Sequence, residues 1–438
     1  MQTSFTLAQL ADPDIAEADK ILRACVHCGF CTATCPTYVL LGDELDSPRG
    51  RIYLIKDMLE NDRPATAEVV KHVDRCLSCL SCMTTCPSGV HYMHLVDHAR
   101  AHIETTYRRP LLDRLVRAAL ARVIPSPDLF RLSLIGAVLG KPLAPLFDLV
   151  GAKPVAAMLR HAPSRLPPRP ARPGGVFPAK GPRRGRVALL SGCVARVLAP
   201  EINAAAIRVL TRHGIEVVLA EGEGCCGSVT HHMGREHEAL AAARANIDAW
   251  SSEMDGEGLD AILTTVSGCG TTMKDYGFML RTDKAYAEKA ARVAALVRDI
   301  SEYVNTIKDL RATGAMAPVV AYHAACSLQH GQKVTSEPKE LLCKVGFVVK
   351  DVPEGHLCCG SAGIYNLLQS ELANRLRERK IANIQKIAPD VIAAGNIGCI
   401  TQIAAGIGIP VVHPIELIDW ATGGKAPVGI PPNGARRR

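Results

Sequence analysis

The sequence predicts an α+β protein in which a helical, cysteine-rich N-terminal domain precedes a duplicated α/β domain with parallel strands. Three observations support this prediction. Two closely similar cysteine runs lie within residues 1–108. From residue 187 onward, four cysteines recur after 133 residues or, in one case, 130 residues. Between those cysteines, short apolar runs alternate with helical patterns, which is typical of βαβ units.

Length and cysteine content limit the possible classes of protein. A chain of 438 residues exceeds one ordinary core, so two or three domains are expected. The N-terminus has no basic start followed by an apolar stretch, which predicts a cytoplasmic protein without a signal peptide. The 17 cysteines are then expected to be metal ligands or redox thiols, not a disulfide framework. The best apolar run, residues 132–140, is shorter than the ~20 residues of a transmembrane helix.

The net charge of +8 is concentrated in two places, residues 162–186 and the three arginines that end the chain. Aromatic residues make up only 4% of the sequence, so we expect no stacking surface and no nucleic-acid partner. Solvated linker charge is the favoured interpretation. Weak attraction to the cytoplasmic face of the inner membrane, or to an acidic partner subunit, stays open.

The first cysteine-rich segment contains two runs with the same spacing, C-x2-C-x2-C-x3-C-P. This spacing is typical of bacterial-type ferredoxins that hold two [4Fe–4S] clusters, because the first three cysteines wrap one cluster and the fourth reaches the other. We therefore expect a ferredoxin-type domain over residues 1–108. The crossed pattern assigns Cys25, Cys28, Cys31 and Cys86 to cluster 1, and Cys35, Cys76, Cys79 and Cys82 to cluster 2.

Two zinc sites are the alternative interpretation of these runs, since zinc ribbons also use paired C-x2-C units. Three cysteines in C-x2-C-x2-C followed by Cys-Pro, present twice, favour iron–sulfur clusters. The nearby His27, His91, His94 and His98 are expected at the surface or around the ligands.

Two connecting segments follow the ferredoxin-type domain. Residues 109–161 show amphipathic helical patterns interrupted by prolines, which predicts a helical connector. Residues 162–186 are rich in proline and arginine and cannot build a core, so we expect an extended linker.

The second half of the chain contains an internal repeat. Cys193, Cys225 and Cys226 each recur 133 residues later, as Cys326, Cys358 and Cys359, and Cys269 recurs as Cys399. Because this period far exceeds that of a solenoid, we expect a duplicated domain with repeats over 187–310 and 311–438. The unpaired Cys343 is expected to be a buried helical cysteine.

Each repeat contains three apolar runs that predict strands, and cysteines follow every one of them. The expected strands are residues 186–192, 215–222 and 260–268, then 318–324, 347–352 and 390–396. Sites form at the carboxyl ends of parallel strands, so the six loops are expected to converge on one cleft. His323, His330, Lys274 and Tyr276 lie near these loops, where we expect packing or supporting roles.

The strings EGEGCCGSV and EGHLCCGSAG place two adjacent cysteines on glycine-flanked loops. Adjacent cysteines do not reach two corners of a regular cubane without strain, which indicates an unusual cluster or a redox thiol pair. The pattern resembles the cysteine-rich CCG domains of heterodisulfide reductase subunits, and the resemblance implies a third, non-cubane [4Fe–4S] cluster. The sequence departs from that pattern because Thr272 and Gln402 stand where the last cysteine of each repeat is expected. A third cluster and a scaffold that only kept its cysteines both stay open.

A more extensive resemblance begins with ILRACVHCGFCTATCPTYVLLGDELDSPRGRIYLIK and includes ARANIDAW, SGCGTTMKDYG, HLCCGSAGIY and NIGC. These strings are similar to those of the iron–sulfur subunits of bacterial glycolate oxidase. The resemblance implies a complex in which a flavin-containing subunit oxidises glycolate to glyoxylate, with D-lactate as a further candidate substrate, beside a second related subunit. This chain would pass electrons towards membrane quinone or another acceptor. No acid–base constellation for hydroxy-acid oxidation is evident, so we expect neither FAD, NAD nor catalytic residues on this chain.

Three other functions are compatible with the same cysteines. One is the iron–sulfur subunit of a lactate-utilisation or anaerobic glycerol-3-phosphate dehydrogenase complex, which neighbouring genes would distinguish. The second is a heterodisulfide-reductase-like enzyme, which predicts thiol–disulfide turnover by the isolated chain. The third is a zinc-stabilised interaction protein, which predicts a colourless product containing zinc.

Overall fold

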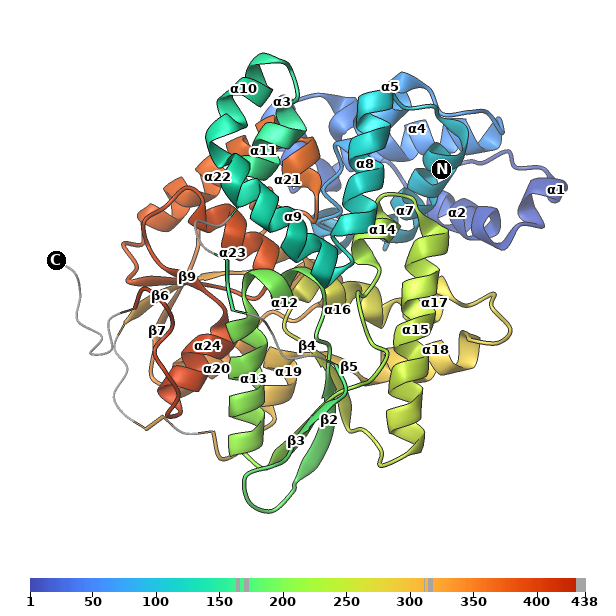
Figure 1. Cartoon of the computed structure of the whole chain (residues 1–438). Helices are drawn as coiled ribbons and strands as arrows, with labels where there is room; N and C mark the ends of the chain where they lie inside the picture. The colour runs from blue at the N-terminus through green and yellow to red at the C-terminus, as the bar shows by residue number, and fades with distance from the viewer. Residues whose placement is uncertain (163–165, 169–172, 311, 314–317, 431–438) are drawn as a thin grey trace.

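The computed structural model describes residues 1–162, 166–168, 173–310, 312–313 and 318–430. Within these residues the fold is α+β, as the sequence predicts. Figure 1 shows the helices of the N-terminal third and of the connector on one side of the molecule, and the two sheets on the other.

The N-terminal domain is helical. Its elements are α1 (Leu7–Leu10), α2 (Pro13–Ala24), η1 (Phe30–Thr32), α3 (Pro36–Leu41), η2 (Glu44–Asp46), α4 (Pro48–Glu60), α5 (Ala67–Asp74), α6 (Ser81–Thr85) and α7 (Tyr92–Thr106). A proline at the first position starts α2, α3 and α4, where its fixed φ suits the helix and no amide hydrogen is lost. Leu22, Ile55 and Leu95 are fully buried in the core between these helices.

The connector consists of α8 (Leu111–Val123), α9 (Pro127–Gly140), η3 (Lys141–Leu143), α10 (Ala144–Leu149) and α11 (Lys153–His161). The sequence predicted no helix long enough to cross a membrane. This prediction was wrong, because the structure has one helical segment that is long and apolar enough by length and composition. Helical structure continues through Lys141 and Pro142, so Pro127–Leu149 forms a 23-residue segment with a mean hydropathy of 1.4. Only 11% of its most apolar stretch is buried.

The expected linker over 162–186 is only partly a linker. β1 (Gly175–Phe177) pairs antiparallel with β3 (Ile215–Leu219) and forms the edge of a sheet. Arg186 is buried and its guanidinium contacts Glu216 and Glu253, so part of the basic excess is neutralised by ion pairs. Residues 163–165 and 169–172 of the expected linker lie outside the described residues.

The first repeat forms a five-stranded sheet of order β1-β3-β2-β4-β5, parallel except for β1. Its other strands are β2 (Gly185–Leu189), β4 (Ala261–Thr264) and β5 (Val297–Asp299). Its helices are α12 (Val194–Leu198), α13 (Pro200–Arg212), α14 (Ser228–His232), α15 (Glu236–Asp255), α16 (Ser267–Lys274), α17 (Tyr276–Met279), α18 (Ala287–Leu296) and α19 (Ile300–Asn305).

The second repeat forms a four-stranded parallel sheet of order β7-β6-β8-β9. The strands are β6 (Val319–His323), β7 (Val348–Asp351), β8 (Val391–Ala394) and β9 (Val411–Val412). The helices are η4 (Ser327–Gln332), α20 (Glu337–Lys344), α21 (Tyr365–Leu368), α22 (Ser370–Gln385), α23 (Ile397–Ala404) and α24 (Pro414–Ala421). The six predicted strands are observed, whereas β1, β5 and β9 were missed.

The two repeats share one hydrophobic core, which joins residues of both sheets with α13, α19, α20 and α24. Across this core, Arg208 and Arg212 of α13 both donate to the buried carboxylate of Asp419, at 2.8 and 2.9 Å. A buried carboxylate needs such partners, because an unpaired one would lose its hydration without compensation.

The N-terminal domain contacts the two repeats in different ways. Asp97 of α7 faces His231 and His232 of the first repeat, at 3.5 and 3.1 Å. Gly234 allows the closest approach there, since a Cβ atom at its φ of +80° would collide with the backbone of Arg100. Towards the second repeat, apolar and sulfur-containing side chains dominate the contact, including Leu77 and Cys79.

Candidate metal centres

The first cysteine cavity, of about 30 Å³, is lined by the four cysteines assigned to cluster 1 and also by Cys82. Its loop carries left-handed residues at His27 and Gly29, with φ of +56° and +86°. These turns curl the chain between successive cysteines, so that Cys25, Cys28 and Cys31 face one space. A side chain at position 29 would meet Arg49 Nη1 at 2.6 Å, which adds a second reason for glycine.

The second cysteine cavity, of about 20 Å³, is lined by the four cysteines assigned to cluster 2, which are Cys35, Cys76, Cys79 and Cys82. Ser78 and Leu80 repeat the left-handed positions of the first run, with φ of +47° and +62°. In both cavities the fourth cysteine comes from the other run. Cys35 leaves the first loop because Pro36 starts α3 directly behind it.

Polar groups point at the sulfur atoms of the second cavity. Thr37 Oγ1 lies 3.2 Å from Cys35 Sγ, and Arg51 Nη1 lies 3.8 Å from the same sulfur. The Tyr92 hydroxyl donates to Cys76 Sγ at 3.8 Å. Donors and positive charge near sulfur stabilise the reduced, more negative form of a cluster and therefore raise its potential.

Arg51 is held by a buried carboxylate. Asp46 accepts from Arg51 at 3.3 Å, from Arg75 at 2.7 Å and contacts His72 Nδ1 at 3.0 Å. Asp46 and His72, with Asp43, have the geometry of a possible metal site. Because two arginines neutralise Asp46, we interpret this group as the support of Arg51.

The surroundings of the first cavity are different. Cys28 is exposed, and the nearby apolar side chains of Val26, Phe30 and Tyr53 are exposed at 67%, 61% and 62%. Apolar side chains at a metal site's edge are typical of a protein contact. The first cavity therefore lies at the surface, whereas the second lies inside.

The cysteines of the two repeats converge, as the positions of the strands predict. One cavity of about 660 Å³ is lined by Cys193, Cys225, Cys226, Cys269, Cys326, Cys358, Cys359 and Cys399. The connector covers this cavity with apolar side chains that include Leu120, Phe130 and Leu134. Cys76 of the second cluster cavity also lines it.

Within this cavity the thiols form two groups. In the second repeat, Cys326 Sγ lies 3.6 Å from Cys358 Sγ. In the first repeat, the neighbouring Cys225 thiol, followed by burial, raises the pKa of Cys193 well above its ordinary value. The two groups differ in their distance from the N-terminal domain, because Cys79 packs beside Cys326 and Cys358.

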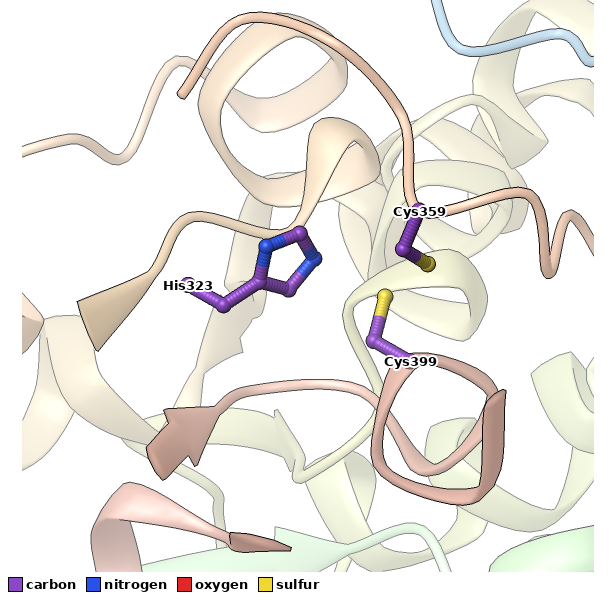
Figure 2. A group of neighbouring side chains, drawn as sticks. All are labelled: His323, Cys359 and Cys399. Carbon is purple, nitrogen blue, oxygen red and sulfur yellow. The ribbon is translucent and has the colours of Figure 1, made fainter. Parts of the chain in front are cut away.

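His323 lies at the carboxyl end of β6 and faces the sulfurs of Cys359 and Cys399, as Figure 2 shows. The ligand atoms of these three residues lie within 4.8 Å of one another, and all three side chains are buried. The adjacent Cys359 thiol is the first cause that lowers the pKa of Cys399, to about 6.

Two partly buried thiols of the N-terminal cavities, Cys31 and Cys82, have raised pKa values. Burial raises the pKa of Cys31 to about 11 and raises the pKa of Cys82 well above its ordinary value. Metal ions bind thiolates and displace the protons. The cysteine cavities therefore fit soft metal ions or iron–sulfur clusters, which supply the positive charge that the buried sulfurs need.

Other predicted residues occupy different places. Cys343 was expected to be buried but is exposed on α20, because Leu341, Leu342 and Val345 occupy the core face of that helix. The remaining residues near the loops have supporting roles: Lys274 pairs with Glu302, Tyr276 donates to Cys226 O, His330 contacts Thr84, and His94 contacts Asp275.

Comparisons with known families match both halves of the chain. Residues 21–90 match the 4Fe-4S dicluster domain family. Residues 187–274 and 320–404 match the family described as a cysteine-rich domain, once for each repeat. The single dicluster match contains both N-terminal cysteine runs, and the two cysteine-rich matches contain the recurring cysteines of the second half.

Among curated proteins, the glycolate oxidase iron–sulfur subunit of Escherichia coli (strain K12) is 45% identical, over 96% of this chain and 99% of that protein. The probable glycolate oxidase iron–sulfur subunit of Bacillus subtilis (strain 168) is 30% identical, over 92% and 95%. Lactate utilization protein A of Bacillus licheniformis is 26% identical but matches only 53% of this chain. The lactate-utilisation alternative therefore fits part of the chain.

A solved structure of a hypothetical protein from Helicobacter pylori has a similar fold. It covers 94% of this chain and 73% of its own, with a TM-score of 0.56 and 10% sequence identity. This likeness concerns the fold alone.

Proposed function

Since the chain belongs to the family of glycolate oxidase iron–sulfur subunits, we propose that it carries electrons from a flavin-containing partner to an acceptor in the membrane. The partner subunit oxidises glycolate to glyoxylate, and a second related subunit completes the complex. The chain itself is the electron-carrying part of this oxidoreductase.

The observation that supports this function best is a continuous series of thiol sites. Cys82 lines both N-terminal cavities, so the two lie side by side. Cys79 of the second cavity packs beside Cys326 and Cys358 of the cleft. The series begins at the exposed Cys28 and ends in the large cavity between the repeats. We infer that the exposed end receives electrons and the cleft end delivers them.

The proposed cofactors are two [4Fe–4S] clusters in the N-terminal domain and a third iron–sulfur centre in the cleft. The first would be held by Cys25, Cys28, Cys31 and Cys86, and the second by Cys35, Cys76, Cys79 and Cys82. Such clusters take up and release one electron at a time. The buried Arg51 and the Tyr92 hydroxyl would raise the potential of the second site relative to the exposed first site.

We also propose that the chain lies on the cytoplasmic face of the membrane, with the connector against the bilayer. Leu132, Leu139 and Leu149 of α9 and α10 are exposed at 65%, 77% and 84%. The neighbouring α8 exposes Leu111 and Leu115 beside Arg114 and Arg122. Exposed leucines flanked by cations favour the surface of an anionic bilayer. The opposite faces of the same helices cover the cleft, which supports a lipid-soluble acceptor such as quinone.

Binding to vesicles that contain phosphatidylglycerol tests this membrane contact. The wild-type chain should sediment with the vesicles, and the double variant Leu132→Asp/Leu139→Asp should stay in the supernatant. Leu7→Asp is a control, because Leu7 is 89% exposed on α1, far along the chain from the connector. Equal sedimentation of all three proteins would refute the membrane contact.

The electron-carrying function is tested by Cys25→Ser in the assembled complex. We expect glycolate-dependent reduction of a dye to disappear, because the serine removes a ligand at the exposed end of the series. Cys343→Ser is the matched control, since this exposed cysteine lies outside every thiol group described. Unchanged dye reduction in Cys25→Ser would remove this cysteine from the function.

A further inference from the structure

His323 is a buried imidazole whose ring nitrogens have no nitrogen or oxygen partner among the described residues. Its side chain is only 1% exposed, and the polar group that acts on it is the Cys399 thiol. A buried polar group without a partner costs about 1–3 kcal/mol, so such a group usually has a ligand or a special role. The neighbouring His330, in contrast, contacts Thr84 Oγ1 at 2.8 Å and His356 O at 3.3 Å.

The free nitrogens of His323 face two cysteine sulfurs. The ligand atoms of His323, Cys359 and Cys399 lie within 4.8 Å of one another. Two ligands bonded to one metal ion at about 2.0–2.3 Å lie at most about 4.6 Å apart. The three side chains are therefore close enough to hold one metal centre, and Figure 2 shows them converging from β6, the CCG loop and α23.

The first repeat lacks this imidazole. Leu190 occupies the position that corresponds to His323, since both lie three residues before the first cysteine of their repeat. Leu190 is buried and apolar and cannot bind a metal ion. The four cysteines of the first repeat consequently have no additional nitrogen ligand at this position.

A buried cation also distinguishes the second repeat. The glycine after each Cys-Cys pair packs against an alanine of the following long helix, Gly227 against Ala239 of α15 and Gly360 against Ala373 of α22. Counted from these two alanines, Lys380 of α22 occupies the position of Asn246 of α15. Lys380 is 2% exposed, and its ammonium donates to Glu354 O at 2.9 Å close to Cys358 and Cys359. Asn246 bonds Cys225 O and is neutral. Positive charge favours several thiolates in one buried site.

The first repeat instead places a buried acid beside its cysteines. Glu223 is 6% exposed, two residues before Cys225, and accepts from Ser191 N at 2.9 Å and Trp250 Nε1 at 3.3 Å. A carboxyl group disfavours further negative charge nearby. The buried charged side chain near the cysteines is thus Lys380 in the second repeat and Glu223, with Arg196 nearby, in the first.

We propose that the third iron–sulfur centre is held by the second repeat alone, and that His323 is one of its ligands together with Cys326, Cys358, Cys359 and Cys399. This inference rests on the proposed electron-carrying function. Imidazole carries no negative charge, so replacing a thiolate by histidine raises the reduction potential of an iron–sulfur centre. The centre nearest the acceptor would then be the strongest electron acceptor on the chain.

Nitrogen coordination gives the test a readout that is independent of activity. Full-length protein is purified anaerobically, its iron is counted, and pulsed EPR of the reduced protein labelled with ¹⁵N-histidine is recorded. We expect about twelve irons per chain, as three [4Fe–4S] centres require, and a coupling to histidine nitrogen. His323→Cys should keep the iron, lose the nitrogen coupling and lower the potential of the third centre.

Two further variants complete the test. His323→Leu, which copies the first repeat, should lose the nitrogen coupling. His330→Asn is the control and should keep it, because both nitrogens of His330 already have partners. Twelve irons without nitrogen coupling in the wild-type protein would refute the ligand role of His323 and leave the electron-carrying function intact. Zinc instead of iron in the whole chain would overturn both.

Discussion

The two CCG repeats have corresponding sheets and four corresponding cysteines, yet different neighbours surround those cysteines. The second repeat adds His323 and the buried Lys380, and Cys79 of the N-terminal domain packs against its thiols. The first repeat has Leu190, Asn246 and the buried Glu223 instead, and it holds the N-terminal domain through ionic contacts with Asp97. Both repeats contact the N-terminal domain, the first through ionic contacts and the second mainly through apolar and sulfur-containing side chains.

The N-terminal duplication shows a similar division. Both cysteine runs form a similar loop, with left-handed residues at the same two positions of the run. The first loop lies at the surface among exposed apolar side chains, whereas the second is enclosed by Arg51, Thr37 and Tyr92. Equal ligand patterns therefore do not imply equal potentials or equal partners, because the surroundings of the sulfurs set both.

The largest expected difference between the repeats concerns Cys358 and Cys225, which occupy the same position. Cys358→Ser should abolish glycolate-dependent quinone reduction by the complex, because the serine breaks the site next to Cys79. Cys225→Ser should reduce quinone at a rate close to the wild-type rate. The measurement is quinone reduction by the assembled complex, with dye reduction as a check on the N-terminal sites. Equal loss in both variants would remove the distinction between the repeats.

The two N-terminal cavities are compared by changing neighbouring arginines of one helix. Arg51→Leu should lower the free energy of unfolding by about 3 kcal/mol, because it leaves the buried carboxylate of Asp46 short of one partner. Arg49→Leu should cost less than about 1 kcal/mol, since its pair with Glu44 is partly exposed. Anaerobic urea unfolding followed by circular dichroism measures both. Similar losses would show that the two surroundings are equivalent.

A smaller effect is expected from the buried ammonium of the second repeat. Lys380→Gln should lower the reduction potential of the third centre, because it removes positive charge beside Cys358 and Cys359. Lys386→Gln is the control on the same side of the molecule, where the ammonium bonds Asn383 Oδ1 at 2.9 Å. Redox titration followed by EPR measures the shift. A potential that does not change in Lys380→Gln would contradict the electrostatic role of this lysine.

The smallest predicted effect concerns pH and the ionic contact of the first repeat. Burial alone would lower the pKa of His231, but the carboxylate of Asp97 raises it. A histidine with a raised pKa contributes its full stabilisation at pH values below the ordinary histidine pKa of about 6.5. This stabilisation is lost as the pH rises through the pKa of the histidine in the folded protein. Burial would raise the pKa of Asp97, but His232 and His231 hold it well below its ordinary value. The stabilisation that comes from the lowered pKa of Asp97 is lost only in acid, as pH falls through the folded pKa.

Raising the pH from 6 to 8.5 should therefore lower the free energy of unfolding of the wild-type protein. The decrease should be about 1 kcal/mol larger than in the variant His231→Gln. Scanning calorimetry at the two pH values measures the difference. His213→Gln serves as the control, because the ring of His213 contacts only the carbonyl of Val209 among the hydrogen bonds described. The same pH dependence in His231→Gln and in the wild-type protein would exclude the His231–Asp97 contact.

The sequence predicted those parts of the molecule that depend on local spacing. The crossed cysteine sets and the three cysteine-bearing strands of each repeat follow from short patterns, and both sets of cysteines line the expected cavities. Strands β1, β5 and β9 were missed because they have only two or three residues and form by pairing with distant strands.

Long-range neighbours could not be predicted in the same way. The position of His323 beside Cys399 depends on how β6 and α23 pack. In the sequence, the difference between His323 and Leu190 at the corresponding position of the first repeat could have drawn attention to this histidine. Cys343 was misplaced because a single cysteine gives no periodicity, whereas its apolar neighbours do. The length of the exposed segment Pro127–Leu149 was underestimated because its helical turns continue past Lys141 and Pro142.

Iron and acid-labile sulfide counts on three full-length proteins test the central claim most directly. The wild-type chain and Cys225→Ser should each contain about twelve irons, and Cys358→Ser should contain about eight, because only the second repeat is expected to hold a centre. About twelve irons in Cys358→Ser together with about eight in Cys225→Ser would assign the third centre to the first repeat and contradict this account.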